Sequence, residues 1–204
     1  MHEDFSAPLR RDMKRCIVSD AVSKKSSRVA EQDRADVAVK RANWQFAQLT
    51  VNPERLVFLD ETGVKTNLTK LRGWTQIGHR FVEAIPGGNW DTCSLVQAIA
   101  LDGTRATRVL DGPLNGESFV GFCEWLLAPS LHLGDLVVMD HLSCHKSIQA
   151  VRVIEKVGSH VVYLPPYSPD LNPIGNLFSK IKQLIRVVRP RKLPQIVDAV
   201  RRSL

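Results

Sequence analysis

The chain has 204 residues, of which 44% are hydrophobic and 24% charged, and its formal net charge is +7. This length and composition are typical of a globular domain with one sizeable core, and no apolar run approaches the ~20 residues that cross a bilayer. The N-terminus has no hydrophobic signal segment, and the four cysteines form no CxxC pair. The sequence therefore excludes a membrane-spanning helix and a disulfide-rich scaffold, and it predicts a cytoplasmic protein.

The positive charge is concentrated towards the two ends of the chain. Residues 1–55 carry a net charge of +3 and residues 180–204 carry +7, whereas residues 56–179 carry −3. Basic flanks around an acidic centre suit a polyanion held against metal-binding carboxylates. Charge alone fits solvated helix surfaces equally well.

The first part of the chain differs in pattern from the rest. Residues 1–35 are polar and basic and show no periodicity, so we expect a basic N-terminal arm or linker there. Apolar spacing predicts a helix at 33–49, which Pro53 ends. We expect the compact domain to comprise residues 36–204.

The domain alternates strand and helix patterns. Five strands are predicted, at 56–59, 92–100, 104–110, 136–139 and 161–164. The Asp102-Gly103 pair predicts a hairpin between the second and third strands. Helices are predicted at 119–127, 146–157, 173–188 and 193–204, and apolar stripes that include Leu126 in the first and Val188 in the third are expected to face the core. The fold class is therefore α/β, with a mixed five-stranded sheet that helices flank on both faces.

An aspartate follows each of two buried strands. The runs LVFL at 56–59 and LVVM at 136–139 lead directly into Asp60 and Asp140. Ligands of open α/β sheets gather beyond the carboxyl ends of strands, and two aspartates at neighbouring strand ends can share a hard divalent cation such as Mg²⁺. Two such ions can activate a water or a 3′-hydroxyl for attack on a phosphodiester. This chemistry needs a third carboxylate, which we expect at the start of the helix after the last strand.

That helix start carries a glycine instead. Asn172 is a good N-cap and Pro173 suits the first helical position, so Gly175 becomes the third. A capping glutamate is typical at this third position, and glycine inside a helix costs roughly 1 kcal/mol relative to alanine.

Three sequence blocks resemble those of the DDE transposases of the mariner superfamily, and most closely its bacterial insertion-sequence branch. The blocks are LDETG at 59–63, MDHLSCHK at 139–146 and YLPPYSPDLNPIGN at 163–176. The resemblance implies an RNase H-like catalytic domain that uses two Mg²⁺ or Mn²⁺ ions to cleave and transfer DNA strands at transposon ends. It makes Asp60 and Asp140 the first two catalytic, metal-binding acids. The third falls at Gly175, after the expected 34 intervening residues.

The resemblance also implies DNA as partner, a homodimer on that DNA and association with the bacterial nucleoid. We expect four basic residues to contact DNA: Lys146, Lys180, Lys182 and Arg186. The absence of upstream DNA-reading modules and the early C-terminus lead us to expect a truncated copy.

Gly175 leaves alternatives open. The chain is either a transposase catalytic domain impaired by the missing acid, or a catalytically inactive remnant that binds only DNA or intact transposase. Asp170 could rescue the site, although a turn or capping role is favoured for it. Another RNase H-like nuclease, such as a junction resolvase, is disfavoured by the PPYSPDLNP segment.

Glu61 is interpreted as structural, because it points to the opposite face from Asp60. His141 and His145 are not expected to bind a metal, because no further ligands accompany them, and a capping or phosphate-contact role stays open for His145 and Lys146.

Overall fold

The computed structural model describes residues 30–70, 75–80, 82, 84, 88 and 90–203. Residues 1–29 of the predicted basic arm lie outside this range, so the arm stays a prediction there. The described chain begins with a short 3₁₀ turn at Ala30–Asp33, followed by helix α2 (Ala35–Gln48), which matches the helix predicted at 33–49.

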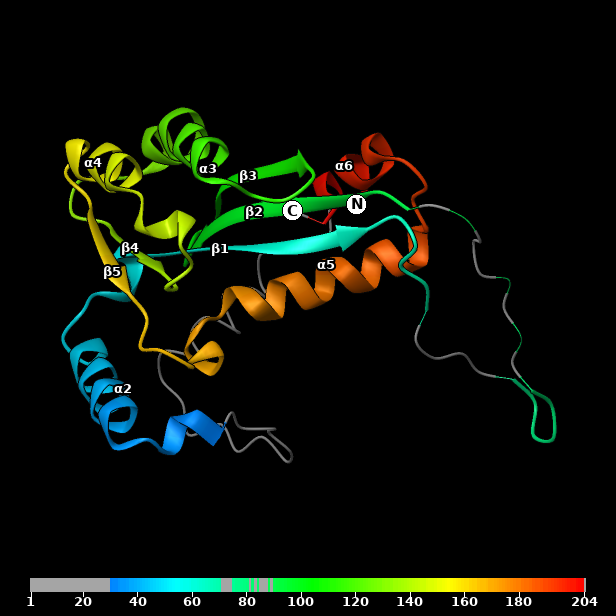
Figure 1. Cartoon of the computed structure of the whole chain (residues 1–204), viewed down its shortest axis with the longest axis horizontal. Helices are drawn as coiled ribbons and strands as arrows, with labels where there is room; N and C mark the ends of the chain where they lie inside the picture. Colours follow the sequence, from blue (N-terminus) through cyan, green and yellow to red (C-terminus); the bar gives the residue numbers. More distant parts are fainter. Residues whose placement is uncertain are drawn as a thin grey trace.

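A mixed five-stranded sheet forms the centre of the molecule (Figure 1), as the sequence predicts. Its strands are β1 (Leu56–Lys65), β2 (Thr92–Ala100), β3 (Gly103–Asp111), β4 (Leu136–Met139) and β5 (His160–Tyr163). They lie in the order β3-β2-β1-β4-β5. The pairs β3–β2 and β2–β1 are antiparallel, whereas β1–β4 and β4–β5 are parallel. The hairpin between β2 and β3 turns at Gly103, whose φ of 136° favours glycine.

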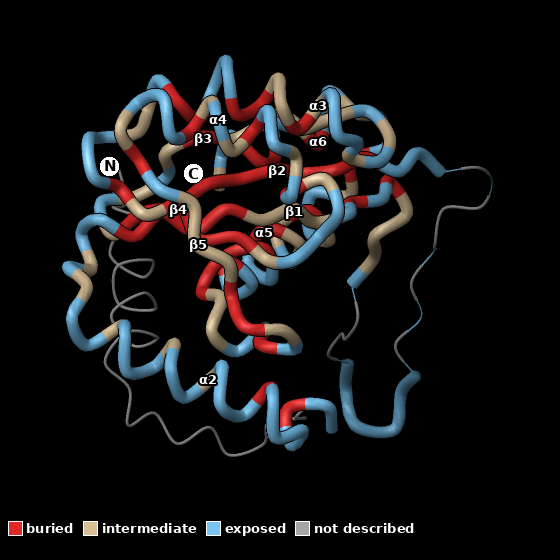
Figure 2. The backbone as a smooth tube through the Cα atoms, turned by 60° about the vertical axis from the view of Figure 1, so that its left-hand side comes forward, coloured by how far each residue is buried: buried red, intermediate tan, exposed pale blue. Residues whose placement is uncertain are grey.

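Helices cover both faces of the sheet. One face carries α3 (Gly116–Phe122), its continuation as a π-helical turn (Cys123–Leu127) and α4 (Ile148–Lys156). The other carries α5 (Ile174–Val188) and α6 (Leu193–Arg201). Helix α2 lies beside the loop that leads into α5 (Figures 1 and 2). Among the described residues, no helix is long and apolar enough to cross a membrane.

Two hydrophobic cores lie on opposite faces of the central strands. Phe58 packs with Ile181 on the α5 side, whereas Leu59 packs with Phe119 and Ile154 on the α3–α4 side. Successive residues of a strand point to opposite faces, so both cores need apolar residues from β1. This explains the unbroken apolar run at 56–59. Figure 2 shows the buried residues running along the strands.

Two residues of the predicted apolar helix stripes are more exposed than expected. Leu126 is 37% exposed because it lies in the π-helical turn, whose wider winding alters the spacing of an α-helical stripe. Val188 is 44% exposed because α5 ends there, with Arg189 in the left-handed conformation and Pro190 next. The prediction that these apolar residues are buried is therefore wrong where the regular α-helical geometry ends.

Candidate active site

The pairing of β1 with β4 brings the two aspartates together. The last paired residues are Phe58 and Val138, and two residues further along each chain stand Asp60 and Asp140. Neighbouring strands lie ~4.8 Å apart, so the carboxylates sit side by side at the end of β4. Their proximity has an electrostatic effect, because the negative charge of Asp140 contributes to the raised pKa of Asp60.

Asp60 does not end its strand, contrary to the sequence prediction. β1 continues to Lys65 because its other edge pairs with β2 as far as Thr92. β4 is shorter and stops at Met139. Asp60 therefore lies within a long strand, at the level where its parallel neighbour ends, and this still places it at the carboxyl edge where α/β sheets bind ligands.

Both carboxylate oxygens of Asp60 accept hydrogen bonds. The backbone N–H of Glu61 donates to Oδ1 at 2.8 Å, and Asn172 Nδ2 donates to Oδ2 at 2.9 Å. Burial, followed by the negative charges of Glu61 and Asp140, raises the pKa of Asp60 to about 6, against the lowering effect of the Glu61 N–H. A half-buried carboxylate with acidic neighbours is a group that a bound cation would stabilise.

The start of α5 lies next to Asp60. The helix begins at Ile174, one residue later than predicted, so Gly175 is its second residue. Asn172 joins the helix to the site, because its Oδ1 accepts from the Ile174 N–H at 3.4 Å while its amide holds Asp60. A Cβ added at Gly175 would meet no atom within 4 Å. Position 175 therefore has room for a side chain and carries none.

Asp170 has a structural partner of its own. Arg41 of α2 donates to both of its carboxylate oxygens, to Oδ1 at 3.0 Å and to Oδ2 at 2.6 Å, and Gln32 Nε2 donates to Oδ1 at 3.2 Å. Burial alone would raise the pKa of Asp170, but the hydrogen bonds and charge of Arg41 outweigh it and hold the pKa below its usual value. These contacts favour an anchoring role over rescue of the missing ligand.

Asp140 is held by a histidine that sequence reasoning did not assign to the site. His145 Nδ1 donates to Asp140 Oδ1 at 2.6 Å, and the Leu142 N–H donates to the same oxygen at 2.9 Å. The hydrogen bond from His145 is the main reason that the pKa of Asp140 is lowered. The only sequence signal was a histidine five residues after the aspartate.

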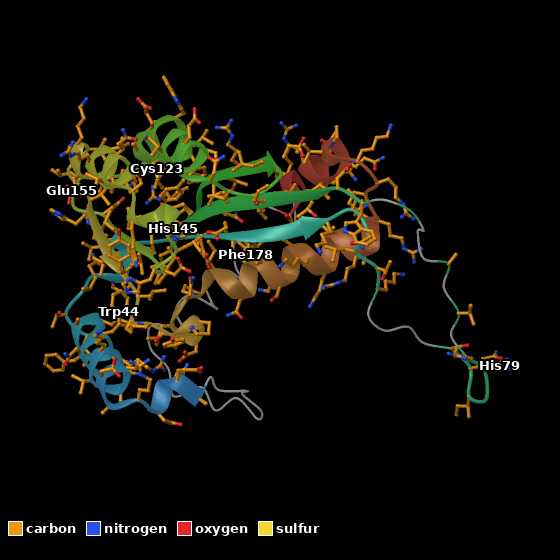
Figure 3. All side chains as sticks on the ribbon, in the orientation of Figure 1. Trp44, His79, Cys123, His145, Glu155 and Phe178 are labelled. Atoms are coloured by element: carbon orange, nitrogen blue, oxygen red, sulfur yellow. The ribbon has the colours of Figure 1, made fainter. Side chains whose placement is uncertain are left out.

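The environment of His145 corrects the phosphate-contact interpretation. Its side chain is 0% exposed, so it cannot reach a ligand, and it lies beside β1 (Figure 3). Its Nε2 lies 3.1 Å from Glu61 Oε2, an ion pair whose alignment falls outside hydrogen-bond geometry. Burial opposes protonation of the ring, but Asp140 and Glu61 outweigh it and raise the pKa of His145 to about 9.

The donor set fits a hard divalent cation but is one ligand short. Asp60 and Asp140 supply oxygen atoms of the kind that Mg²⁺ and Mn²⁺ prefer. Within the described parts of the chain, no three His, Cys, Asp or Glu side chains are grouped to hold a metal ion. The sequence resemblance assigns the further donor to position 175, where this chain has glycine.

The four basic residues predicted to bind DNA occupy two places. Three lie on α5, the helix that starts at the site: Lys180 is exposed, and Lys182 and Arg186 are half-buried. Burial, followed by the charge of Arg186, lowers the pKa of Lys182. Lys146 is exposed and directly follows His145. Their contact with DNA stays a prediction.

Comparison with known proteins decides the family. The sequence pattern described as "DDE superfamily endonuclease" matches residues 55–196 of this chain. The chain belongs to the DDE superfamily endonucleases. That match spans both aspartates, Gly175 and all five strands of this DDE domain. No curated protein sequence matches it.

Solved structures with a similar fold include several of the Mos1 transposase. One is titled "Mos1 transposase paired-end complex with left transposon end", with 14% identity and a TM-score of 0.69, covering 99% of this chain and 72% of that chain. The "Mos1 mariner paired end complex with Mn" has 15% identity and a TM-score of 0.70, with 97% and 61% covered. The "catalytic domain of Mos1 mariner transposase" has 14% identity and a TM-score of 0.57, with 98% and 82% covered. At these identities the likenesses show the fold alone, and they confirm the predicted RNase H-like architecture, a mixed five-stranded sheet flanked by helices.

Proposed function

We propose that this DDE domain is the catalytic domain of an insertion-sequence transposase that cleaves and transfers DNA strands in the bacterial cytoplasm. Asp60 and Asp140 are its metal-binding catalytic residues, and position 175 is the place of the third acid. The observation that carries this proposal is the strand register that sets the two aspartates side by side, next to the start of α5. Gly175 leaves the activity impaired.

The metal is a divalent ion, Mg²⁺ or Mn²⁺, with two ions in an intact site. The oxygen donors suit these ions, and two of the similar structures are Mos1 paired-end complexes titled with Mn and with Mg. When bound, such ions activate the attacking oxygen and stabilise the leaving oxygen of a phosphodiester. The protein's own part is to fix the donors: Asn172 orients Asp60, and His145 holds Asp140.

DNA is the partner that the charge distribution supports. The proposed DNA-binding residues are Lys146, Lys180, Lys182 and Arg186, which lie near the site or on the helix that leads away from it. Salt-dependent attraction to phosphates is the expected contribution of such residues. The Mos1 structures include a paired-end complex and a strand transfer complex. By analogy, a homodimer on DNA is the proposed assembly.

A second function is favoured by Gly175 itself. Without a third carboxylate, the domain is an inactive remnant that only binds DNA or intact transposase. The chain supplies no substitute ligand through Asp170, because Arg41 already occupies that carboxylate. The two proposals differ in whether any divalent-ion-dependent cleavage remains.

A nicking assay separates these functions. Supercoiled plasmid DNA is incubated with Mn²⁺ and either the unaltered protein, Gly175→Glu or the matched neutral control Gly175→Gln. We expect strong nicking only with Gly175→Glu, and its loss when Asp140→Asn is added. Weak Mn²⁺-dependent nicking by the unaltered protein indicates impairment, and none indicates a remnant. Equal nicking by the unaltered protein and Gly175→Glu would show that the third ligand lies elsewhere.

A further inference from the structure

A fully buried histidine lies behind Asp140. His145 faces a carboxylate at each ring nitrogen, with Asp140 Oδ1 2.6 Å from Nδ1 and Glu61 Oε2 3.1 Å from Nε2. Ionised carboxylate oxygens only accept hydrogen bonds, so each ring nitrogen of His145 carries a hydrogen that faces a carboxylate. Glu61 reaches the ring from β1, on the sheet face opposite Asp60. The ring therefore connects the turn after β4 to the neighbouring strand.

His145 is fixed by further elements besides these two acids. The Tyr163 hydroxyl of β5 donates to the backbone carbonyl of His145 at 3.0 Å. The Phe119 ring of α3 packs against the imidazole, with 4.8 Å between ring centroids. With its backbone bonded to β5 and its ring in contact with β1 and α3, His145 belongs to the rigid frame of the domain.

Asp140 is less constrained than its partner Asp60. It follows the last residue of β4, and its side chain is 47% exposed, so its rotamer would otherwise be free. Both protein hydrogen bonds to it, from His145 and Leu142, converge on Oδ1. Among the described residues, no hydrogen-bond donor reaches Oδ2. The arrangement thus holds one oxygen and leaves the other available.

We propose that His145 is a positioning residue whose Nδ1–H fixes Oδ1 of Asp140 and so presents Oδ2 to a divalent ion, while Glu61 holds the far side of the ring. This inference rests on the proposed function, because it assigns Asp140 to the metal. Partners that orient metal ligands from behind typically contribute 10–100-fold to metal affinity or activity. Glu61, interpreted from sequence as structural, thereby supports the site through His145.

Two substitutions of His145 separate positioning from packing. In His145→Asn the amide nitrogen can take the place of Nδ1 and still donate to Asp140. In His145→Gln the amide nitrogen takes the place of Nε2 and faces Glu61 instead. Both remove the ring that packs on Phe119, so a role in packing alone would affect them alike.

The measurement is Mn²⁺ affinity, from the electron paramagnetic resonance signal of free Mn²⁺, in protein that also carries Gly175→Glu. We expect His145→Asn to bind Mn²⁺ within about threefold of this background and His145→Gln to bind it about 10–100-fold more weakly. Thermal unfolding checks that both variants fold. Equal affinities of the two variants would overturn the inference. Absence of Mn²⁺ binding in the Gly175→Glu background would overturn the proposed function and this inference with it.

Nuclear magnetic resonance gives a test that keeps His145 in place. In Gly175→Glu protein we expect a downfield Nδ1–H signal of His145 that is protected from exchange with water. This signal should shift when Mg²⁺ saturates the site, because the ion binds the carboxylate of Asp140 that accepts this hydrogen bond. A missing signal, or one that Mg²⁺ leaves unchanged, would contradict the positioning role even if neither variant folded.

Discussion

Gly175 occupies a position where the structure does not require glycine. Its φ is not in the left-handed region, and a Cβ there meets nothing within 4 Å. Gly158 provides the contrast, because its φ is +79° and an added Cβ would lie 2.3 Å from Leu133 Cδ1. Gly158 is thus needed by the backbone, whereas Gly175 removes a side chain without any structural gain.

A pair of alanine substitutions tests this difference. Gly175→Ala should stabilise the protein by about 0.5–1 kcal/mol, because alanine loses less backbone entropy in a helix. Gly158→Ala should destabilise it by more than this amount, because a residue with a side chain is strained in the left-handed conformation that Gly158 adopts. The measurement is the free energy of unfolding in urea. A destabilising Gly175→Ala would reveal a constraint that the structure lacks.

The candidate site residues could be proposed from the sequence, whereas their contacts could not. Asp60, Asp140 and position 175 followed from two strand ends and a helix start, together with the family resemblance. The contacts of His145, a hydrogen bond to Asp140 and an ion pair with Glu61, could not be predicted from the sequence. The ion pair joins residues 84 positions apart, because β1 packs against the turn after β4. Local sequence patterns do not predict contacts between residues so far apart in the chain.

At the scale of elements, α2 supports the loop that leads to the site. Arg41 donates to Ser168 Oγ at 2.7 Å as well as to Asp170, and Gln32 Nε2 donates to the Tyr167 carbonyl at 2.7 Å. Tyr167 has a φ of 54°, which is uncommon for a residue other than glycine. The same loop ends at Asn172, which holds Asp60. Contacts with α2 therefore steady the segment that orients Asp60, the proposed catalytic aspartate.

The ion pair between Arg41 and Asp170 makes a pH-dependent contribution to stability. The folded pKa of Asp170 is lowered, so the contribution is present above the unfolded pKa of 3.8 and is lost as pH falls through the folded pKa. Asp170→Asn should cost roughly 0.5–1 kcal/mol at pH 7, a modest value because the pair is partly exposed. Urea unfolding between pH 7 and pH 3 should show this difference closing in acid.

A matched control is Asp198→Asn, which removes an exposed acid that lies 3.9 Å from Arg201. We expect its effect to stay within about 0.5 kcal/mol at every pH. A difference between wild type and Asp170→Asn that persists unchanged at pH 3 would show that the carboxylate charge is not what anchors the loop.

Element boundaries were predictable where apolar periodicity continued and not where pairing decided them. The apolar run of β1 ends at Leu59, yet the strand reaches Lys65, because β2 provides hydrogen-bond partners along its whole length. Conversely, α5 keeps its predicted stripe buried as far as Ile185, in the last turn before Arg189 takes the left-handed conformation. Strand pairing is a long-range property that a single segment does not encode.

At the scale of the whole molecule, the two cores share the central strands. Phe58 belongs to the core under α5, and the adjacent Leu59 belongs to the core under α3 and α4. Neither core can be disrupted without disturbing β1. The domain should therefore unfold as one cooperative unit, although its sheet separates the two cores.

Removing volume from either core tests this cooperativity. Ile181→Ala and Ile154→Ala each truncate a fully buried side chain, one on each face of the sheet. Each should cost about 2–5 kcal/mol, because a cavity adds to the lost transfer free energy. Urea unfolding followed by circular dichroism should show a single transition with an unchanged slope in both variants. A second transition in either variant would mean that the two layers unfold separately.

The α/β class and the mixed sheet were predictable from the order of strand and helix patterns, whereas the RNase H-like topology came from the family resemblance. Periodicity cannot place β1 between β2 and β4, since all three read as apolar runs. The prediction at this scale therefore depended on motifs, chiefly the segment at 163–176.

The central claim is that Asp60, Asp140 and the start of α5 form one divalent-ion site. The most direct measurement is anomalous scattering from a crystal of the Gly175→Glu protein soaked in Mn²⁺, with Gly175→Gln as control. The account predicts Mn²⁺ bonded to both aspartates and to the introduced carboxylate, and weaker or absent density in the control. Mn²⁺ bound elsewhere, with the two aspartates sharing no ion, would contradict it.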